Sequence, residues 1–69
     1  MYSVKNKPSY WKNHKYTVIR DCRNEEGPTK GYWYYGGYDS LQLAQEAKNA
    51  IGNGWIVETS DIDGYERAA

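Results

Sequence analysis

The fold of this chain is decided by one aromatic run: Gly31-Tyr32-Trp33-Tyr34-Tyr35-Gly36-Gly37-Tyr38. The sequence of 69 residues has eight tyrosines, three tryptophans and no phenylalanine, and five of these aromatic residues lie in the run. Aromatic residues favour β-strands, and a strand sends successive side chains to opposite faces of a sheet. We therefore predict Tyr32 and Tyr34 on one face and Trp33 and Tyr35 on the other.

The segments on either side of this run predict two more strands. Residues 14–22 are rich in β-branched and aromatic side chains and predict a first strand, which forms a hairpin with the aromatic strand at residues 31–36. Residues 23–30 contain adjacent acidic residues, a glycine and a proline, which are typical of a loop. Residues 54–59 predict a third strand, with Trp55 and Val57 facing the core.

A helix is predicted between the aromatic run and the third strand, over residues 41–51. Asp39-Ser40 supplies an N-cap, and Gly52 is suited to the left-handed position that ends a helix. Apolar residues recur at helical spacing. The predicted buried stripe, unusually rich in alanine, consists of Leu43, Ala44, Ala47, Ala50 and Ile51.

The predicted order is β-β-α-β, which gives an α+β fold with a three-stranded antiparallel sheet of order 2-1-3. One helix covers one face, so the far face is predicted to be uncovered. Three parts follow: residues 1–13 as a flexible, basic extended arm, residues 14–59 as the domain, and residues 60–69 as a flexible acidic tail. Residues 1–23 hold six lysines and arginines against one acidic residue, and residues 39–69 hold six acidic residues against two basic ones.

The side chains that catalysis or metal binding would need are sparse. Cys22 is the only cysteine and His14 the only histidine, so no internal disulfide or cysteine-based zinc site is expected. Adjacent Glu25 and Glu26 diverge in a turn instead of converging as an acid–base pair. We expect no enzyme activity, cofactor or metal. The polar N-terminal residues predict no signal peptide, and no apolar stretch is long enough for a membrane span, so the expected location is the cytoplasm.

The composition indicates a binding surface, because Tyr and Trp combine a large apolar ring with a polar tip and dominate binding hot spots. Whichever pair of the aromatic strand faces outward is expected to contact a partner. The acidic tail would add an electrostatic contribution. The predicted partner-binding residues are Tyr32, Trp33, Tyr34, Tyr35, Tyr38, Asp61, Asp63 and Glu66.

A nucleic-acid-binding domain is the alternative interpretation. Lys30-Gly31-Tyr32-Trp33-Tyr34 resembles the start of the RNP1 motif of RNA-recognition motifs, but Trp33 stands where that motif has a small residue. The basic arm could supply a stacking groove for single strands. The residues for this alternative are Lys5, Lys7, Trp11, Lys12 and Lys15. A homodimer, formed by two uncovered sheet faces, is a third possibility.

The pattern over residues 14–59 resembles small phage-encoded proteins. An aromatic hairpin is followed by the short helix that begins at Ser40-Leu41 and by a strand that begins Gly54-Trp55-Ile56-Val57. This order of elements is similar to that of the T7-type phage inhibitor of bacterial RNA polymerase and of several short anti-CRISPR proteins. The resemblance implies a non-enzymatic inhibitor that binds a host protein or nucleoprotein complex in the host cytoplasm. A CRISPR effector complex is the first expected target and RNA polymerase the second.

Overall fold

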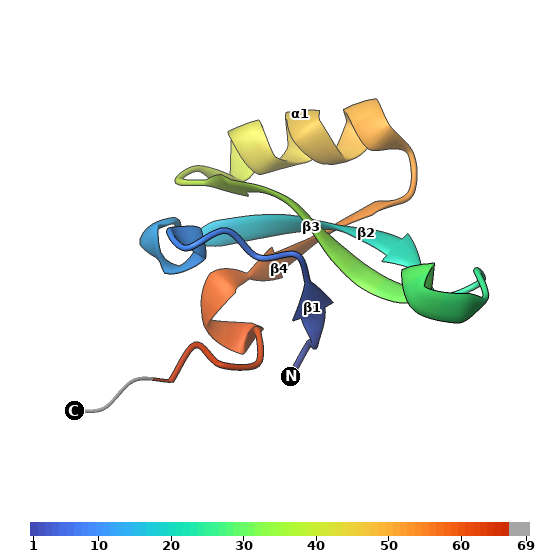
Figure 1. Cartoon of the computed structure of the whole chain (residues 1–69). Coiled ribbons are helices and arrows are strands. Elements are labelled where there is room, and N and C mark those ends of the chain that lie inside the picture. The colour runs from blue at the N-terminus through green and yellow to red at the C-terminus, as the bar shows by residue number, and fades with distance from the viewer. Residues whose placement is uncertain (67–69) are drawn as a thin grey trace.

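Four strands form one mixed sheet in the computed structural model, which describes residues 1–66 (Figure 1). In chain order they are β1 (Val4–Lys5), β2 (Tyr16–Cys22), β3 (Gly31–Tyr38) and β4 (Gly54–Glu58). They lie side by side in the order β1-β3-β2-β4. β2 pairs antiparallel with β3 and with β4, whereas β1 runs parallel to β3.

One helix, α1 (Leu41–Ile51), lies across one face of this sheet, and the N-terminal segment and the end of the described chain lie on the other (Figure 1). Three short 3-10 turns complete the structure: η1 (Trp11–Asn13), η2 (Gly27–Thr29) and η3 (Thr59–Asp61). No helix within residues 1–66 is long and apolar enough to cross a membrane.

The predicted α+β class with one helix is confirmed, but the predicted sheet is incomplete. The expected antiparallel order 2-1-3 corresponds to β3-β2-β4, and β1 is missing from it. Residues 1–13, predicted as a flexible arm, therefore contribute a strand to the sheet. β1 has only two residues, too few to produce an alternating pattern, and its pairing with β3 joins segments distant in the chain.

The start of α1 follows the sequence closely, but its buried face does not. Ser40 is the N-cap, and its side-chain Oγ accepts a hydrogen bond from the Leu43 backbone N–H at 3.2 Å. Ala44 is fully buried, whereas the side chain of Leu43 is 51% exposed. The prediction that Leu43 is buried is wrong, because the small alanine defines the line of closest approach to the sheet.

The far face of the sheet carries the main hydrophobic core. We call this cluster the far-face core; it consists of Val4, Trp11, Ile19, Val57 and Ile62, with Tyr32, Tyr34 and Tyr65 packed against it. The prediction of an uncovered far face is therefore wrong, because the N-terminal segment and the last part of the described chain, with Ile62 and Tyr65, fold back over it. The basis for a dimer formed by two bare sheet faces is removed with it.

A β-bulge in β3 interrupts the alternation of the aromatic run. Ile19 lies opposite Tyr34 and Val18 opposite Gly36, which leaves Tyr35 as the extra residue. Tyr32 and Tyr34 share one face, as predicted, and both pack on the far-face core. The regular alternation predicted for Trp33 and Tyr35 ends at the bulge.

Gly37 permits a close approach of side chains to β3 just beyond this bulge. A Cβ atom at this position would lie 2.6 Å from the His14 ring and 2.9 Å from the Tyr34 hydroxyl oxygen. His14 also places its Nδ1 atom 3.2 Å from Oδ1 of Asp39. His14 therefore packs against Gly37 and contacts Asp39 at the open end of the β2–β3 hairpin.

Candidate protein-binding site at the edge of the sheet

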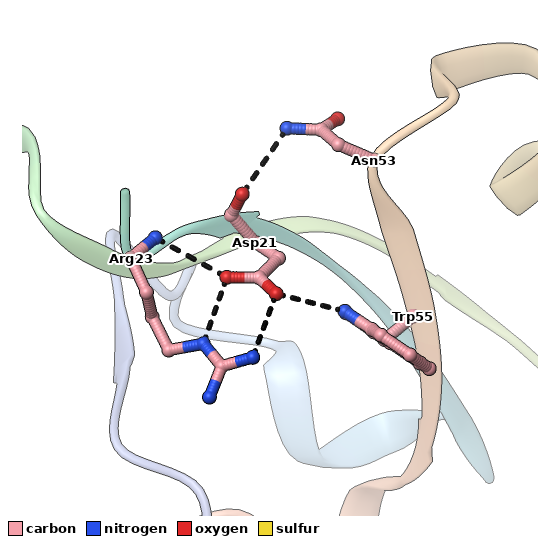
Figure 2. Close-up of polar contacts among 4 residues, drawn as sticks. All are labelled: Asp21, Arg23, Asn53 and Trp55. Atoms are coloured by element: carbon pink, nitrogen blue, oxygen red, sulfur yellow. Dashed lines mark hydrogen bonds and ion pairs between the residues drawn. The ribbon is translucent and has the colours of Figure 1, made fainter. Parts of the chain in front are cut away.

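A polar cluster surrounds Asp21 near the end of β2 (Figure 2). The guanidinium of Arg23 donates from Nε to Asp21 Oδ1 and from Nη2 to Asp21 Oδ2, both at 2.9 Å. The Arg23 backbone N–H also donates to Oδ1, at 3.2 Å. From the neighbouring strand, the Trp55 indole N–H donates to Asp21 Oδ2 at 3.1 Å. One carboxylate therefore ties the β2 end to β4.

Further contacts hold this cluster in place. The Arg23 guanidinium lies 5.1 Å from the ring centroid of Tyr32, within the range of a cation–π interaction. Asn53 donates from Nδ2 to the backbone carbonyl of Asp21 at 3.4 Å, and the Asp21 backbone N–H donates to the Asn53 carbonyl at 2.9 Å. The turn before β4 is thus bonded to both the backbone N–H and the backbone carbonyl of Asp21.

The hydrogen bonds of Arg23 hold the pKa of Asp21 well below its usual range, and the indole N–H of Trp55 acts in the same direction. A carboxyl group with a depressed folded-state pKa contributes stability above its unfolded pKa and loses it as the pH falls through the folded pKa. The contact between Asp21 and Trp55 therefore belongs to the ionised form of the carboxylate.

We expect the Trp55 indole N–H signal to keep its chemical shift as the pH is lowered from 7 to about 3, where an ordinary aspartate is mostly protonated. The reason is that Asp21 stays ionised there. An NMR pH titration measures this directly. In the Arg23→Ala variant, which removes the largest cause of the shift, the same signal should move near pH 4. If the Trp55 indole N–H signal of the wild-type protein also moved near pH 4, the assigned role of Arg23 would be contradicted.

The hydrogen bond to Asp21 holds a large exposed ring in a defined orientation. The side chain of Trp55 is 52% exposed, although its indole N–H is bonded to the Asp21 carboxylate. Trp55 lies opposite Ile19 and shares the face of the buried Val57, as predicted, but its ring stays exposed instead of entering the core. A ring that is already oriented loses little rotamer entropy when a partner binds, which favours affinity.

The outer backbone edge of β4 is unpaired within residues 1–66. The bonds from Asp21 N–H to Asn53 and from Thr59 N–H to Lys15 bracket the strand. Antiparallel pairing alternates, so Trp55 and Val57 bond to β2 and Ile56 and Glu58 turn their backbone groups outward. An unpaired edge of this kind is where a partner strand can be added.

The aromatic strand predicted as the contact surface is divided by the fold. Tyr32 and Tyr34 belong to the far-face core, and burial raises the pKa of Tyr34. Tyr38 is half-buried, and its ring lies over Gly36. Tyr35, at the bulge, remains 44% exposed, and Trp33 is half-buried. Tyr35 is therefore the one exposed ring of this run, and the other four are half-buried.

The acidic residues near the C-terminus lie on an ordered segment within the described residues. Asp61, Asp63 and Glu66 are all exposed. Their segment is held beside the N-terminus by bonds from Tyr2 N–H to the Asp61 carbonyl at 2.9 Å and from Asp63 N–H to the Tyr2 carbonyl at 2.7 Å. The last three residues of the predicted acidic tail lie outside the described residues.

The basic residues proposed for nucleic acid do not gather around an accessible ring at Trp11. This indole is only 8% exposed, and the Nζ atoms of Lys7 and Lys12 lie 5.2 and 5.6 Å from its centroid. Lys5 lies instead over Trp33, and Lys15 over Tyr16. The lysines cover rings of the protein itself, and Trp11 has little surface on which a base could stack.

The sequence offered only a weak signal for the cluster of Asp21, Arg23 and Trp55. Acidic and basic side chains two residues apart at a strand end are common in loops, and the pairing of β4 with β2 brings Trp55 to them. No protein-family model, curated protein or solved structure matches this chain.

Proposed function

We propose that this protein is a non-enzymatic inhibitor that binds a partner protein through the β4 edge. The observation that carries the proposal is Trp55, a half-exposed indole that Asp21 holds on an edge strand whose outer side is unpaired within residues 1–66. Oriented tryptophans are typical hot spots of protein interfaces. The outward backbone groups of Ile56 and Glu58 would add main-chain hydrogen bonds to a partner strand.

The target class that we propose is a host nucleic-acid machine, with a phage as the source of the inhibitor. A CRISPR effector complex is the first choice and RNA polymerase the second. Two points support this class: the order of elements resembles small phage inhibitors, and Asp61, Asp63 and Glu66 are exposed on one segment. Machines that hold nucleic acid have basic channels, to which such a segment is complementary.

Replacing Trp55 with alanine should weaken the affinity for the target by about 2 kcal/mol or more, which is roughly thirtyfold in Kd. The measurement is inhibition of guide-directed DNA cleavage by a purified CRISPR effector and of transcription by purified RNA polymerase. Trp55→Phe keeps an aromatic ring, though a smaller one, but loses the bond to Asp21, so its effect should be intermediate. Tyr10→Ala is the matched control, because Tyr10 is 56% exposed but lies outside β4.

Two results would count against this function. One is full inhibition by the Trp55→Ala variant. The other is a wild-type protein that inhibits neither enzyme and retains no partner protein from a bacterial lysate after nuclease treatment. Binding to nucleic acid that falls steeply with salt, and that is lost when Lys12 and Lys15 are changed to glutamate, would instead favour the nucleic-acid alternative.

A further inference from the structure

A concave site, distinct from the β4 edge, lies on the helix-side face of the sheet near the end of β2. It is a cavity of about 400 Å³, within the size range of small-ligand pockets. Arg20 and Trp33 are paired across β2 and β3 and therefore share this face. The turn before β4 contributes Asn53, and the β2–β3 loop contributes Glu25 and Thr29.

Trp33 forms a fixed aromatic wall of this cavity. Its indole N–H donates to the backbone carbonyl of Thr29 at 2.7 Å. The Lys5 ammonium lies 5.8 Å from the ring centroid and donates to the Pro28 carbonyl at 3.3 Å. The loop, the indole and the ammonium therefore hold one another. Lys5 lies over one face of the ring, so the opposite face is the preset plane on which a flat molecule can stack.

Arg20 supplies a cation that is not neutralised by a carboxylate within residues 1–66. It is exposed and lies directly opposite Trp33. Arg23, three residues on, has its guanidinium engaged by Asp21. Arg23 is therefore structural, whereas Arg20 is free to bind an anion at the mouth of the cavity. Guanidinium groups match the geometry of phosphate oxygens.

Two of the remaining polar groups, Glu25 and Asn53, favour a ligand that donates hydrogen bonds. The carboxylate of Glu25 can only accept them. Asn53 uses its Nδ2 to hold Asp21, which leaves its side-chain oxygen as the free end. The thiol of Cys22 also lines the cavity, and burial, aided by the nearby Glu25, raises its pKa, so it stays neutral. A flat ligand with an N–H edge and an attached anion would match the Trp33 ring, the Glu25 carboxylate and the Arg20 guanidinium.

We propose that this cavity binds a guanine nucleotide. The purine ring stacks on Trp33, the N1–H and 2-amino donors of guanine face the Glu25 carboxylate, and the phosphate contacts Arg20. Guanine fits better than adenine, because adenine has an acceptor at N1 and would place it against a carboxylate. The site is separate from the Trp55 edge, so either proposal can fail without the other.

The test is a titration of the whole protein with GMP, followed by the indole N–H signal of Trp33 in NMR spectra. GMP should shift this signal. AMP should bind at least about tenfold more weakly, since it lacks the N1–H and 2-amino donors that face Glu25. Guanosine, which has no phosphate, should also bind more weakly. Arg20→Ala should weaken GMP binding about tenfold or more, the typical loss of a charge-assisted contact.

Glu25→Gln should remove the preference for GMP over AMP while the protein stays folded. The control is Lys30→Ala, an exposed cation of the same loop that does not line the cavity; it should leave the GMP affinity unchanged. The proposal is overturned if GMP at about 10 mM leaves the Trp33 signal unmoved, or if AMP and GMP bind equally well to the wild type. Binding of single-stranded RNA without any response to GMP also overturns it.

Discussion

Replacing Trp11 with alanine will lower the free energy of unfolding by about 3–5 kcal/mol, the range for removal of a large buried aromatic side chain. Trp11, in the N-terminal segment, belongs to the far-face core together with Ile62 near the end of the described residues. Its ring meets the ring of Tyr65 edge to face, with centroids 6.1 Å apart. The loss is a large share of the total stability of a domain of this size.

Equilibrium unfolding in urea, followed by circular dichroism, measures this loss. Tyr10→Ala is the matched control: it removes the neighbouring aromatic residue, which is exposed, and should change the stability by only about 0.5 kcal/mol. A cost below about 1 kcal/mol for Trp11→Ala would mean that residues 1–13 behave as the mobile arm expected from their composition.

The second large effect is expected at Ile62, where alanine should cost about 2–4 kcal/mol. The Ile62 side chain is fully buried in the far-face core, although it lies between two exposed aspartates. It also forms a parallel bridge with Tyr2, so it joins the N-terminal segment to the last part of the described chain. The substitution therefore leaves a cavity beneath the sheet where these two segments meet.

Chemical denaturation of Ile62→Ala and of Asp63→Ala separates packing from charge. Asp63→Ala keeps the backbone bond to Tyr2 and should leave the stability within about 0.5 kcal/mol of the wild type. The loss of unfolding free energy in the double variant Trp11→Ala/Ile62→Ala should differ from the sum of the two single losses, because both side chains belong to one cluster. Strict additivity, or an unaltered midpoint for Ile62→Ala, would argue against a shared core.

Local patterns in the sequence were sufficient for the elements that carry a strong signal. The aromatic strand, the hairpin with residues 14–22, and the helix with its Ser40 cap and Gly52 end were all predicted from neighbouring residues. Each rests on a short-range cause: side-chain alternation in a strand, a hydroxyl that accepts a bond from the first turn, or a glycine at a positive φ. These causes act within a few residues and can be recognised without knowledge of the fold.

The candidate site was predicted less well, because its residues come together through strand pairing. Asp21 and Trp55 are far apart in the sequence, and only the register of β2 with β4 places the indole N–H on the carboxylate. The bulge at Tyr35 likewise cannot be recognised in an uninterrupted aromatic run. It changes which rings face the core and which remain on the surface.

By itself, therefore, the sequence determined the α+β class, the helix and the antiparallel order of β3, β2 and β4. The tertiary structure alone decided what covers the far face. Val4, Trp11 and Ile62 lie in largely polar segments, so no periodicity identifies them as core. They become core because burying isolated apolar side chains is favourable wherever the chain can return to the sheet, and the bonds of Tyr2 to Asp61 and Asp63 hold both ends there.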